Sequence, residues 1–104
     1  MASGVGGDAD GDWPGERLTA LREQLDELDE RLVGVLEERF RVTREVGRLK
    51  AEAGLAAVDI RREERILTRL EMVAEQAGLD PDLLRGLYRQ IFDAVVAEHR
   101  ALGR

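Results

Sequence analysis

A run of apolar residues at alternating spacings of three and four is the feature that most limits how this chain can fold. The run consists of Leu18, Leu21, Leu25, Leu28, Leu32, Val35, Val42, Val46 and Leu49. This spacing places the side chains along one stripe of an α-helix and is typical of a seam that packs against another helix. One position of the stripe carries a cation, Arg39. We therefore predict one long helix over residues 17–53, ended by Gly54.

The length of this helix predicts self-association. At about 1.5 Å per residue it would be roughly 55 Å long. A compact monomer of 104 residues has a radius of gyration of only about 13 Å, and a domain of this size buries a modest share of its surface alone. A second copy is the simplest cover for the exposed seam, so we expect an intertwined helical homodimer.

Two shorter helices are predicted after the long one. Asp59 can cap the second by accepting backbone N–H groups, and Gly78 follows its end. The stripe of this helix is Ile66, Leu67, Leu70, Val73 and Ala77. The Asp80-Pro81 pair is typical of the start of a third helix. Its stripe is Leu84, Leu87, Tyr88, Ile91, Val95 and Val96, continued by His99.

The pattern predicts an all-α fold with three helices, because the sequence contains no β-alternation, internal repeat or glycine-rich phosphate loop. Residues 1–15 differ from the rest in composition. They are rich in Gly, Ala and Asp and cannot bury enough apolar surface to order themselves. We predict a flexible tail over residues 1–15 and one helical domain over residues 16–104.

The charge and the rare residue types exclude several classes of function. The formal net charge is −6, from 22 acidic and 16 basic residues, which disfavours nucleic acids and anionic membrane surfaces as partners. The absence of cysteine and the single histidine argue against thiol chemistry and a zinc site. No apolar run reaches the roughly 18 residues of a membrane helix. We expect a cytoplasmic protein without metal or cofactor.

Several cations stand where they could converge on an anionic small molecule. Arg39 and Lys50 are eleven residues apart, which places them within about 20° around the helix and about 16 Å apart along it. Arg22 lies about 25 Å from Arg39 and about 100° round the helix, so it cannot reach the same ligand. It could enter the site of a second copy if two long helices pack antiparallel. Arg62 and Glu63, in the first turn of the second helix, could then close the pocket.

Each of these residues also has a plain structural explanation. A lone arginine on a seam often pairs with an acidic residue across an interface and fixes the register. Lys50 and Arg22 could be solvated helix surface, and Asp59 is explained by its capping role. His99 could lie at the edge of the core or point to water. On the residues alone, these alternatives stay open.

The order and spacing of these residues resemble the all-helical class of chorismate mutase. The resemblance runs from about Leu18 to His99 and rests on a string of short motifs. They are Leu21-Arg22-Glu23, Asp26, Asp29, Glu38-Arg39, Glu45-Val46-Gly47-Arg48-Leu49-Lys50 and Val58-Asp59-Ile60-Arg61-Arg62-Glu63. The resemblance implies an isomerase that rearranges chorismate to prephenate in the biosynthesis of phenylalanine and tyrosine, without metal or cofactor.

The resemblance also implies a role for each cation. Arg22 from the partner chain and Arg39 would bind the carboxylates of the dianionic substrate. Lys50 would hold the ether oxygen and a carboxylate, and Arg62 would assist at the pocket wall. The active sites would therefore be shared between the two chains of the dimer.

The remaining site residues implied by the resemblance include two departures from the family. Asp59 and Glu63 would contact the ring hydroxyl of the substrate. Val95 stands where family members commonly have a serine, and His99 stands where they commonly have a glutamine that donates to the ether oxygen. Both departures lie one turn apart on the third helix, so they alter one wall of the pocket and leave the exact substrate open.

Two alternatives to chorismate rearrangement follow. The first is a related mutase that acts on 4-amino-4-deoxychorismate or, ranked last, an isochorismate-pyruvate lyase. The second is a non-catalytic helical dimer or regulatory module. Whether another enzyme of the shikimate pathway binds this chain is not decided by the sequence.

Overall fold

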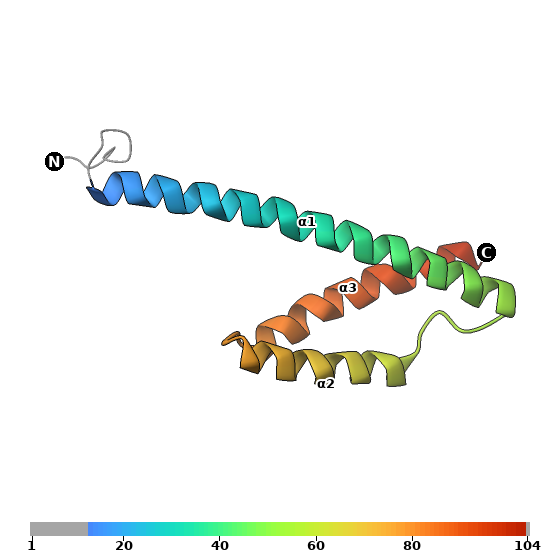
Figure 1. The fold of residues 1–104 in the computed structure, drawn as a ribbon. Helices are drawn as coiled ribbons and strands as arrows, with labels where there is room; N and C mark the ends of the chain where they lie inside the picture. The colour runs from blue at the N-terminus through green and yellow to red at the C-terminus, as the bar shows by residue number, and fades with distance from the viewer. Residues whose placement is uncertain (1–12, 104) are drawn as a thin grey trace. The chain divides into compact units, whose positions relative to one another are not determined.

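The computed structural model describes residues 13–103 and contains three α-helices, without a strand in this range. They are α1 (Trp13–Ala53), α2 (Ile60–Gln76) and α3 (Pro81–Leu102) (Figure 1). The prediction of an all-α fold with one long and two shorter helices is confirmed. Residues 1–12 of the predicted tail lie outside the described residues.

The start of α1 differs from the prediction by about one turn. The helix begins at Trp13, whereas the sequence pattern predicted Arg17. Pro14 fits the first turn because the N–H groups of that turn have no partner within the helix. Glu16 suits the same turn because the N-terminus of a helix carries partial positive charge.

The end of α1 lies at Ala53, as predicted. Gly54 has a φ of 68°, a left-handed conformation that glycine adopts without strain. The N–H of Leu55 then donates to the carbonyl of Lys50 at 2.8 Å. This bond satisfies one of the carbonyls that a helix end leaves unpaired.

The starts of α2 and α3 confirm both predicted caps. The carboxylate of Asp59 accepts a hydrogen bond from the backbone N–H of Arg62 at 3.0 Å. The carboxylate of Asp80 does the same for the N–H of Asp82 at 2.9 Å, and Pro81 occupies the first helical turn. Both helices therefore begin where local side chains satisfy backbone donors that would otherwise have no partner.

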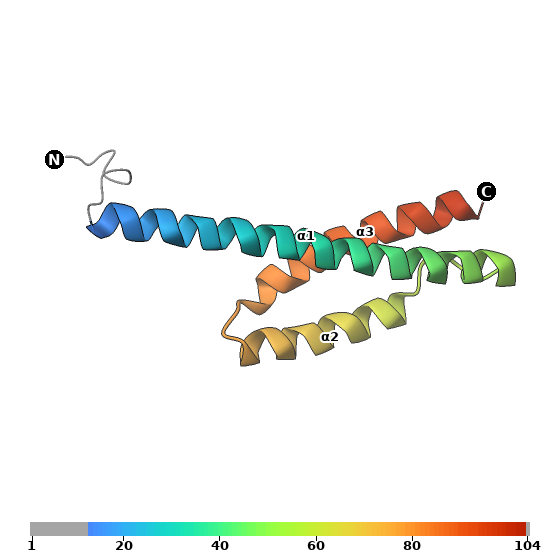
Figure 2. The same cartoon turned by 45° about the horizontal axis from the view of Figure 1, so that its top comes forward.

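The described chain divides into two compact units between Arg39 and Phe40. The first unit contains the N-terminal part of α1, and the second contains the end of α1 together with α2 and α3. In the second unit the chain reverses direction after α1 and again after α2 (Figure 1, Figure 2). Consecutive helices of this unit therefore run in opposite directions.

The core of the second unit lies between α2 and α3. Ile66, Leu67 and Phe92 are buried there, and Leu70 and Tyr88 pack against them. The rings of Tyr88 and Phe92 meet edge to face with their centroids 5.9 Å apart, an arrangement that the charge distribution of aromatic rings favours. This cluster is small, as expected for a short chain that relies on further packing.

Some of the predicted core positions are wrong. Val73 and Leu87, predicted on the inner stripes, are 49% and 51% exposed, whereas Ala74 is buried. Ala74 lies one turn after Leu70 on the face of α2 that α3 covers. The neighbouring Val73 side of α2 is left without a cover in the described chain.

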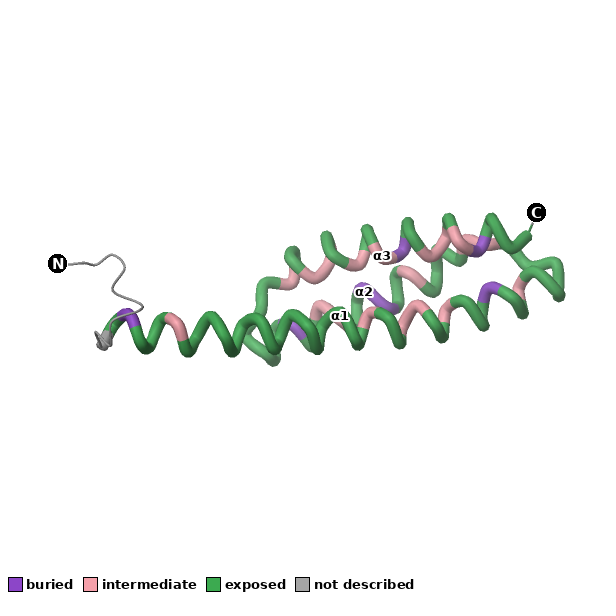
Figure 3. The backbone as a smooth tube through the Cα atoms, turned by 90° about the horizontal axis from the view of Figure 1, so that it is seen from above, coloured by how far each residue is buried: buried purple, intermediate pink, exposed green. Residues whose placement is uncertain are grey.

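The apolar seam of α1 is also uncovered in the described chain (Figure 3). The first-unit leucines Leu21, Leu25, Leu28 and Leu32 are 43%, 56%, 50% and 59% exposed. Contiguous apolar surface of this kind is typical of an interaction face rather than of a solvated helix.

Candidate functional site

The predicted site residues are distributed over both units. Arg22 and Arg39 belong to the first unit, on α1. The others belong to the second unit and are Lys50, Asp59, Arg62, Glu63, Val95 and His99. Within the second unit, contacts at Lys50, Asp59 and His99 determine how these side chains are held.

Lys50 ties the end of α1 to the loop before α2. Its Nζ donates a hydrogen bond to the backbone carbonyl of Ala57 at 3.3 Å, and the side chain is half-buried. Ala57 lies two residues before the helix cap Asp59. The contact therefore holds the ammonium group next to the segment that leads into α2.

Asp59 caps α2, and this role is separate from its predicted contact with a ring hydroxyl. Its Oδ1 atom accepts from the N–H of Arg62, which orients the first turn of α2. Arg62 is exposed and Glu63 is half-buried in that turn. The proposed contacts of Asp59 and Glu63 with a ring hydroxyl stay predictions.

His99 is inserted between α3 and α1 and is only 6% exposed. Its Nε2 atom lies 2.7 Å from the backbone carbonyl oxygen of Thr43. A carbonyl oxygen can only accept, so Nε2 carries the proton and donates it to this bond. The Nδ1 atom is buried and has no hydrogen-bond partner among the described residues. The alternative that His99 points to water is therefore wrong.

Gly47 makes room for this imidazole on α1. A Cβ atom at Gly47 would lie 2.5 Å from Cδ2 of His99 and 3.0 Å from Cδ1 of Leu102. Any side chain at this position would push α3 away from α1. In the sequence, Gly47 lies in the motif from Glu45 to Lys50, and a glycine inside a predicted helix is the only signal of its packing role.

An ion pair between Arg44 and Glu98 also joins the end of α1 to α3. Arg44 donates to both carboxylate oxygens of Glu98, at 3.2 and 3.4 Å, beside His99. Val95 lies one turn before His99 on α3 and is half-buried. Its side chain presents no hydrogen-bonding atom on this face of α3.

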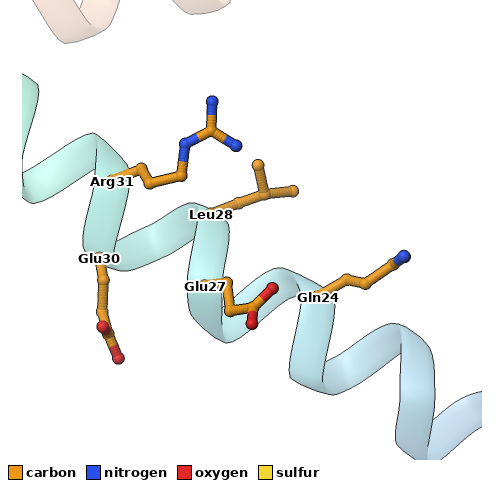
Figure 4. Close-up of a pocket in the computed structure, with 5 residues that line it drawn as sticks. All are labelled: Gln24, Glu27, Leu28, Glu30 and Arg31. Atoms are coloured by element: carbon orange, nitrogen blue, oxygen red, sulfur yellow. The ribbon is translucent and has the colours of Figure 1, made fainter.

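Two surface hollows on α1 lie away from the predicted site residues. One is lined by Gln24, Glu27, Leu28, Glu30 and Arg31, whose side chains point in different directions from successive turns (Figure 4). A second is lined by Glu16, Arg17, Ala20, Leu21 and Gln24. All of these residues come from a single helix, and neither hollow is lined by a predicted site residue. A solitary helix face cannot enclose a small ligand, so we do not assign a site to either hollow.

Among residues 13–103, no group of His, Cys, Asp and Glu side chains is arranged to hold a metal ion. Within the same range, no helix has the length and the apolar character that crossing a membrane requires.

Comparisons with known proteins identify the family of this chain. The family model described as "Chorismate mutase type II" matches residues 21–100. The T-protein of Enterobacter agglomerans is 36% identical over 74 residues, which cover 71% of this chain and 20% of that protein. The bifunctional chorismate mutase/prephenate dehydratase of Escherichia coli K12 is 35% identical over 85 residues, which cover 82% of this chain and 22% of that protein.

A shorter relative is matched over most of its length. The chorismate mutase of Methanocaldococcus jannaschii is 25% identical over 87 residues, which cover 84% of both chains. By contrast, this chain spans only about a fifth of the T-protein and of the bifunctional E. coli protein. The residues matched by the family model include every predicted site residue from Arg22 to His99.

Proposed function

We propose that this chain, which belongs to the type II chorismate mutase family, catalyses the rearrangement of chorismate to prephenate in aromatic amino acid biosynthesis. The reaction is intramolecular: the ether C–O bond breaks while a new C–C bond forms, and no atom enters or leaves. The observation that carries the proposal is the family match over residues 21–100, which contain the whole set of predicted cations.

The chemistry of the side chains suits this reaction. Chorismate is a dianion, and the planar guanidinium groups of Arg22 and Arg39 can each grip a carboxylate through two hydrogen bonds. Such contacts would hold the two reacting ends of the substrate together and supply orientation. The ammonium of Lys50, beside the ether oxygen, would stabilise the negative charge that grows as the C–O bond breaks. Arg62 would support the pocket wall, while Asp59 and Glu63 would accept from the ring hydroxyl.

The site is proposed to form between two copies of the chain. The exposed leucines of α1 provide an apolar face that a second α1 can cover, with the two helices antiparallel. In that arrangement Arg22 of one copy enters the pocket that contains Arg39 and Lys50 of the other. The domain that forms the dimer is proposed to cover residues 16–104, and the chain is proposed to be cytoplasmic, in keeping with its lack of cysteine.

His99 is proposed to act on the ether oxygen in place of the family's glutamine. In the unliganded chain its Nε2 atom is used by the Thr43 carbonyl. A neutral ring then carries no proton on Nδ1, whereas an imidazolium carries one on each nitrogen. Donation to a substrate therefore requires either protonation of the ring or release of Thr43.

A related mutase acting on 4-amino-4-deoxychorismate is the second candidate, favoured by the substitutions at Val95 and His99 in one wall. Isochorismate-pyruvate elimination ranks below it. A helical dimer without activity is the candidate from a different class.

The discriminating experiment supplies purified protein with chorismate, 4-amino-4-deoxychorismate and isochorismate in turn. The loss of substrate and the identity of the product are followed by chromatography. Prephenate formed from chorismate at the highest kcat/KM supports the proposal. A preference for the amino compound would reassign the substrate, and inactivity on all three compounds by a folded dimer would identify a non-catalytic module.

A further inference from the structure

One face of α2 carries a row of arginines whose side chains have no ion-pair partner among residues 13–103. Arg62, Arg65 and Arg69 follow spacings of three and four, which keeps them within about 60° on the helix and spans about 10.5 Å. All three side chains are exposed. They lie on the side of α2 opposite Leu67 and Ala74, which are buried.

The acidic residues of α2 do not neutralise this row. Glu71 pairs with Arg85 of α3, and Glu64 lies 3.8 Å from Arg89 of α3. These two glutamates of α2 therefore face arginines of α3 and not the arginine row. Arg65 and Arg69 make no ion pair with any residue between 13 and 103.

The N-terminal part of α1 has the opposite character. Residues 23–30 contain five acidic side chains and no basic one. Asp26 and Asp29 follow Arg22 by four and seven residues, so the three side chains share one side of α1, next to the leucine seam. Neither aspartate forms an ion pair with another described residue.

The registers of the two rows match in the dimer proposed above, on which this inference rests. The α2 helix runs in the direction opposite to that of the end of α1 (Figure 2). If the two copies of α1 are antiparallel, the second copy's α1 therefore runs in the same direction as α2. With Arg22 of that copy at the first turn of α2, its aspartates follow at about 6 and 10.5 Å, while Arg65 and Arg69 follow Arg62 at about 4.5 and 10.5 Å.

We propose that Asp26 and Asp29 of each copy pair with Arg65 and Arg69 of the other. The apolar seam supplies the area of the interface, while these ion pairs select the antiparallel alignment that brings Arg22 to the partner's site. Charged pairs at the rim of an interface typically determine register and specificity in this way.

A charge swap tests the pairing. We expect Arg65→Glu/Arg69→Glu and Asp26→Arg/Asp29→Arg each to raise the dimer dissociation constant by at least about tenfold at moderate salt, because both copies of the interface then oppose like charges. An equal mixture of the two variants should form heterodimers in preference to either homodimer. Sedimentation equilibrium and native mass spectrometry provide the two measurements.

Matched controls separate this pairing from a general effect of charge. Arg100→Glu makes the same charge change as Arg69→Glu but lies on α3, outside the row, so it should leave the dissociation constant within about twofold. A chain carrying all four reversals should dimerise as the wild type does. If the wild type is a dimer and the Arg65/Arg69 reversal leaves its dissociation constant unchanged, the pairing is wrong but the dimer stands. The arginine row would then be available to another acidic partner. A monomeric wild type would overturn the proposed dimer as well.

Discussion

At the scale of single residues, the contact between His99 and Gly47 connects packing with chemistry. The imidazole enters α1 where the side chain is missing, and its Nε2 atom donates to a carbonyl of the same helix. The ring is therefore positioned by α1 before any ligand binds. Three predictions concern individual side chains on this surface.

The Gly47→Ala substitution should destabilise the protein although alanine is the better helix former. Alanine would gain up to about 1 kcal/mol in helix propensity, but its Cβ atom would overlap the His99 ring, a kind of overpacking that costs roughly 1–3 kcal/mol. Urea unfolding at fixed protein concentration measures the difference. Gly86→Ala is the control, because its Cβ atom would meet nothing within 4 Å. Equal stabilisation by both substitutions would contradict the contact.

The His99→Gln substitution should change how activity depends on pH. Wild-type activity is expected to rise as pH falls and His99 takes up its second proton, until carboxylates such as Glu63 are protonated. Glutamine donates at any ordinary pH, so the variant should lose the acid limb, and His99→Ala should lose activity throughout. Identical pH–rate profiles for the wild type and His99→Gln would remove His99 from the chemistry.

The Lys50→Ala substitution should lower kcat more than it raises KM. The proposed contact with the ether oxygen strengthens as the bond breaks, so its loss falls on the transition state. Removing one preorganised electrostatic group typically lowers kcat by about 10²–10³-fold. Steady-state kinetics with chorismate measures both constants, and circular dichroism checks that loss of the Ala57 contact leaves the helices intact. An unchanged kcat would exclude Lys50 from catalysis.

At the scale of helices, the caps were predictable because they depend on adjacent residues. Asp59 and Asp80 accept from the backbone N–H groups of their own helices, and Gly54 adopts the left-handed conformation at the end of α1. The sequence placed His99 on the inner stripe of the third helix, but its hydrogen-bond partner was not predictable, because the carbonyl of Thr43 lies more than fifty residues away in the chain. Val73 was wrongly assigned for a similar reason. The local sequence pattern does not indicate from which side α3 packs against α2.

The two roles of Asp59 can be separated by substitution. Asparagine preserves the cap, so Asp59→Asn should unfold like the wild type, whereas Asp59→Ala should lose about 1 kcal/mol of stability. If the carboxylate also accepts from the ring hydroxyl, both variants should show a raised KM. Thermal unfolding and steady-state kinetics on the two variants provide the comparison. A wild-type KM for Asp59→Asn would limit this residue to capping.

At the scale of the whole molecule, the exposed seam of α1 favours the proposed dimer as the functional unit. One chain supplies a small core between α2 and α3 and leaves the leucines of α1 uncovered. Dimerisation would therefore complete both the hydrophobic packing and the site.

Mixing two inactive variants tests whether the site is shared. Arg22→Ala and Arg39→Ala homodimers should each be nearly inactive, because every pocket lacks one guanidinium group. In a mixed dimer one pocket lacks both arginines and the other contains both. Refolding equal amounts together makes about half of the dimers mixed, so about a quarter of all pockets become intact and activity should approach about a quarter of the wild-type value.

The control for this experiment mixes the same proteins without unfolding, under conditions in which subunits do not exchange. That mixture should stay as inactive as its parents. A refolded mixture that never exceeds the sum of the parents would show that Arg22 and Arg39 serve the same chain. Together with a dimer in sedimentation equilibrium, that result would keep the assembly and reject the shared pocket, because apolar burial along α1 does not depend on where Arg22 points.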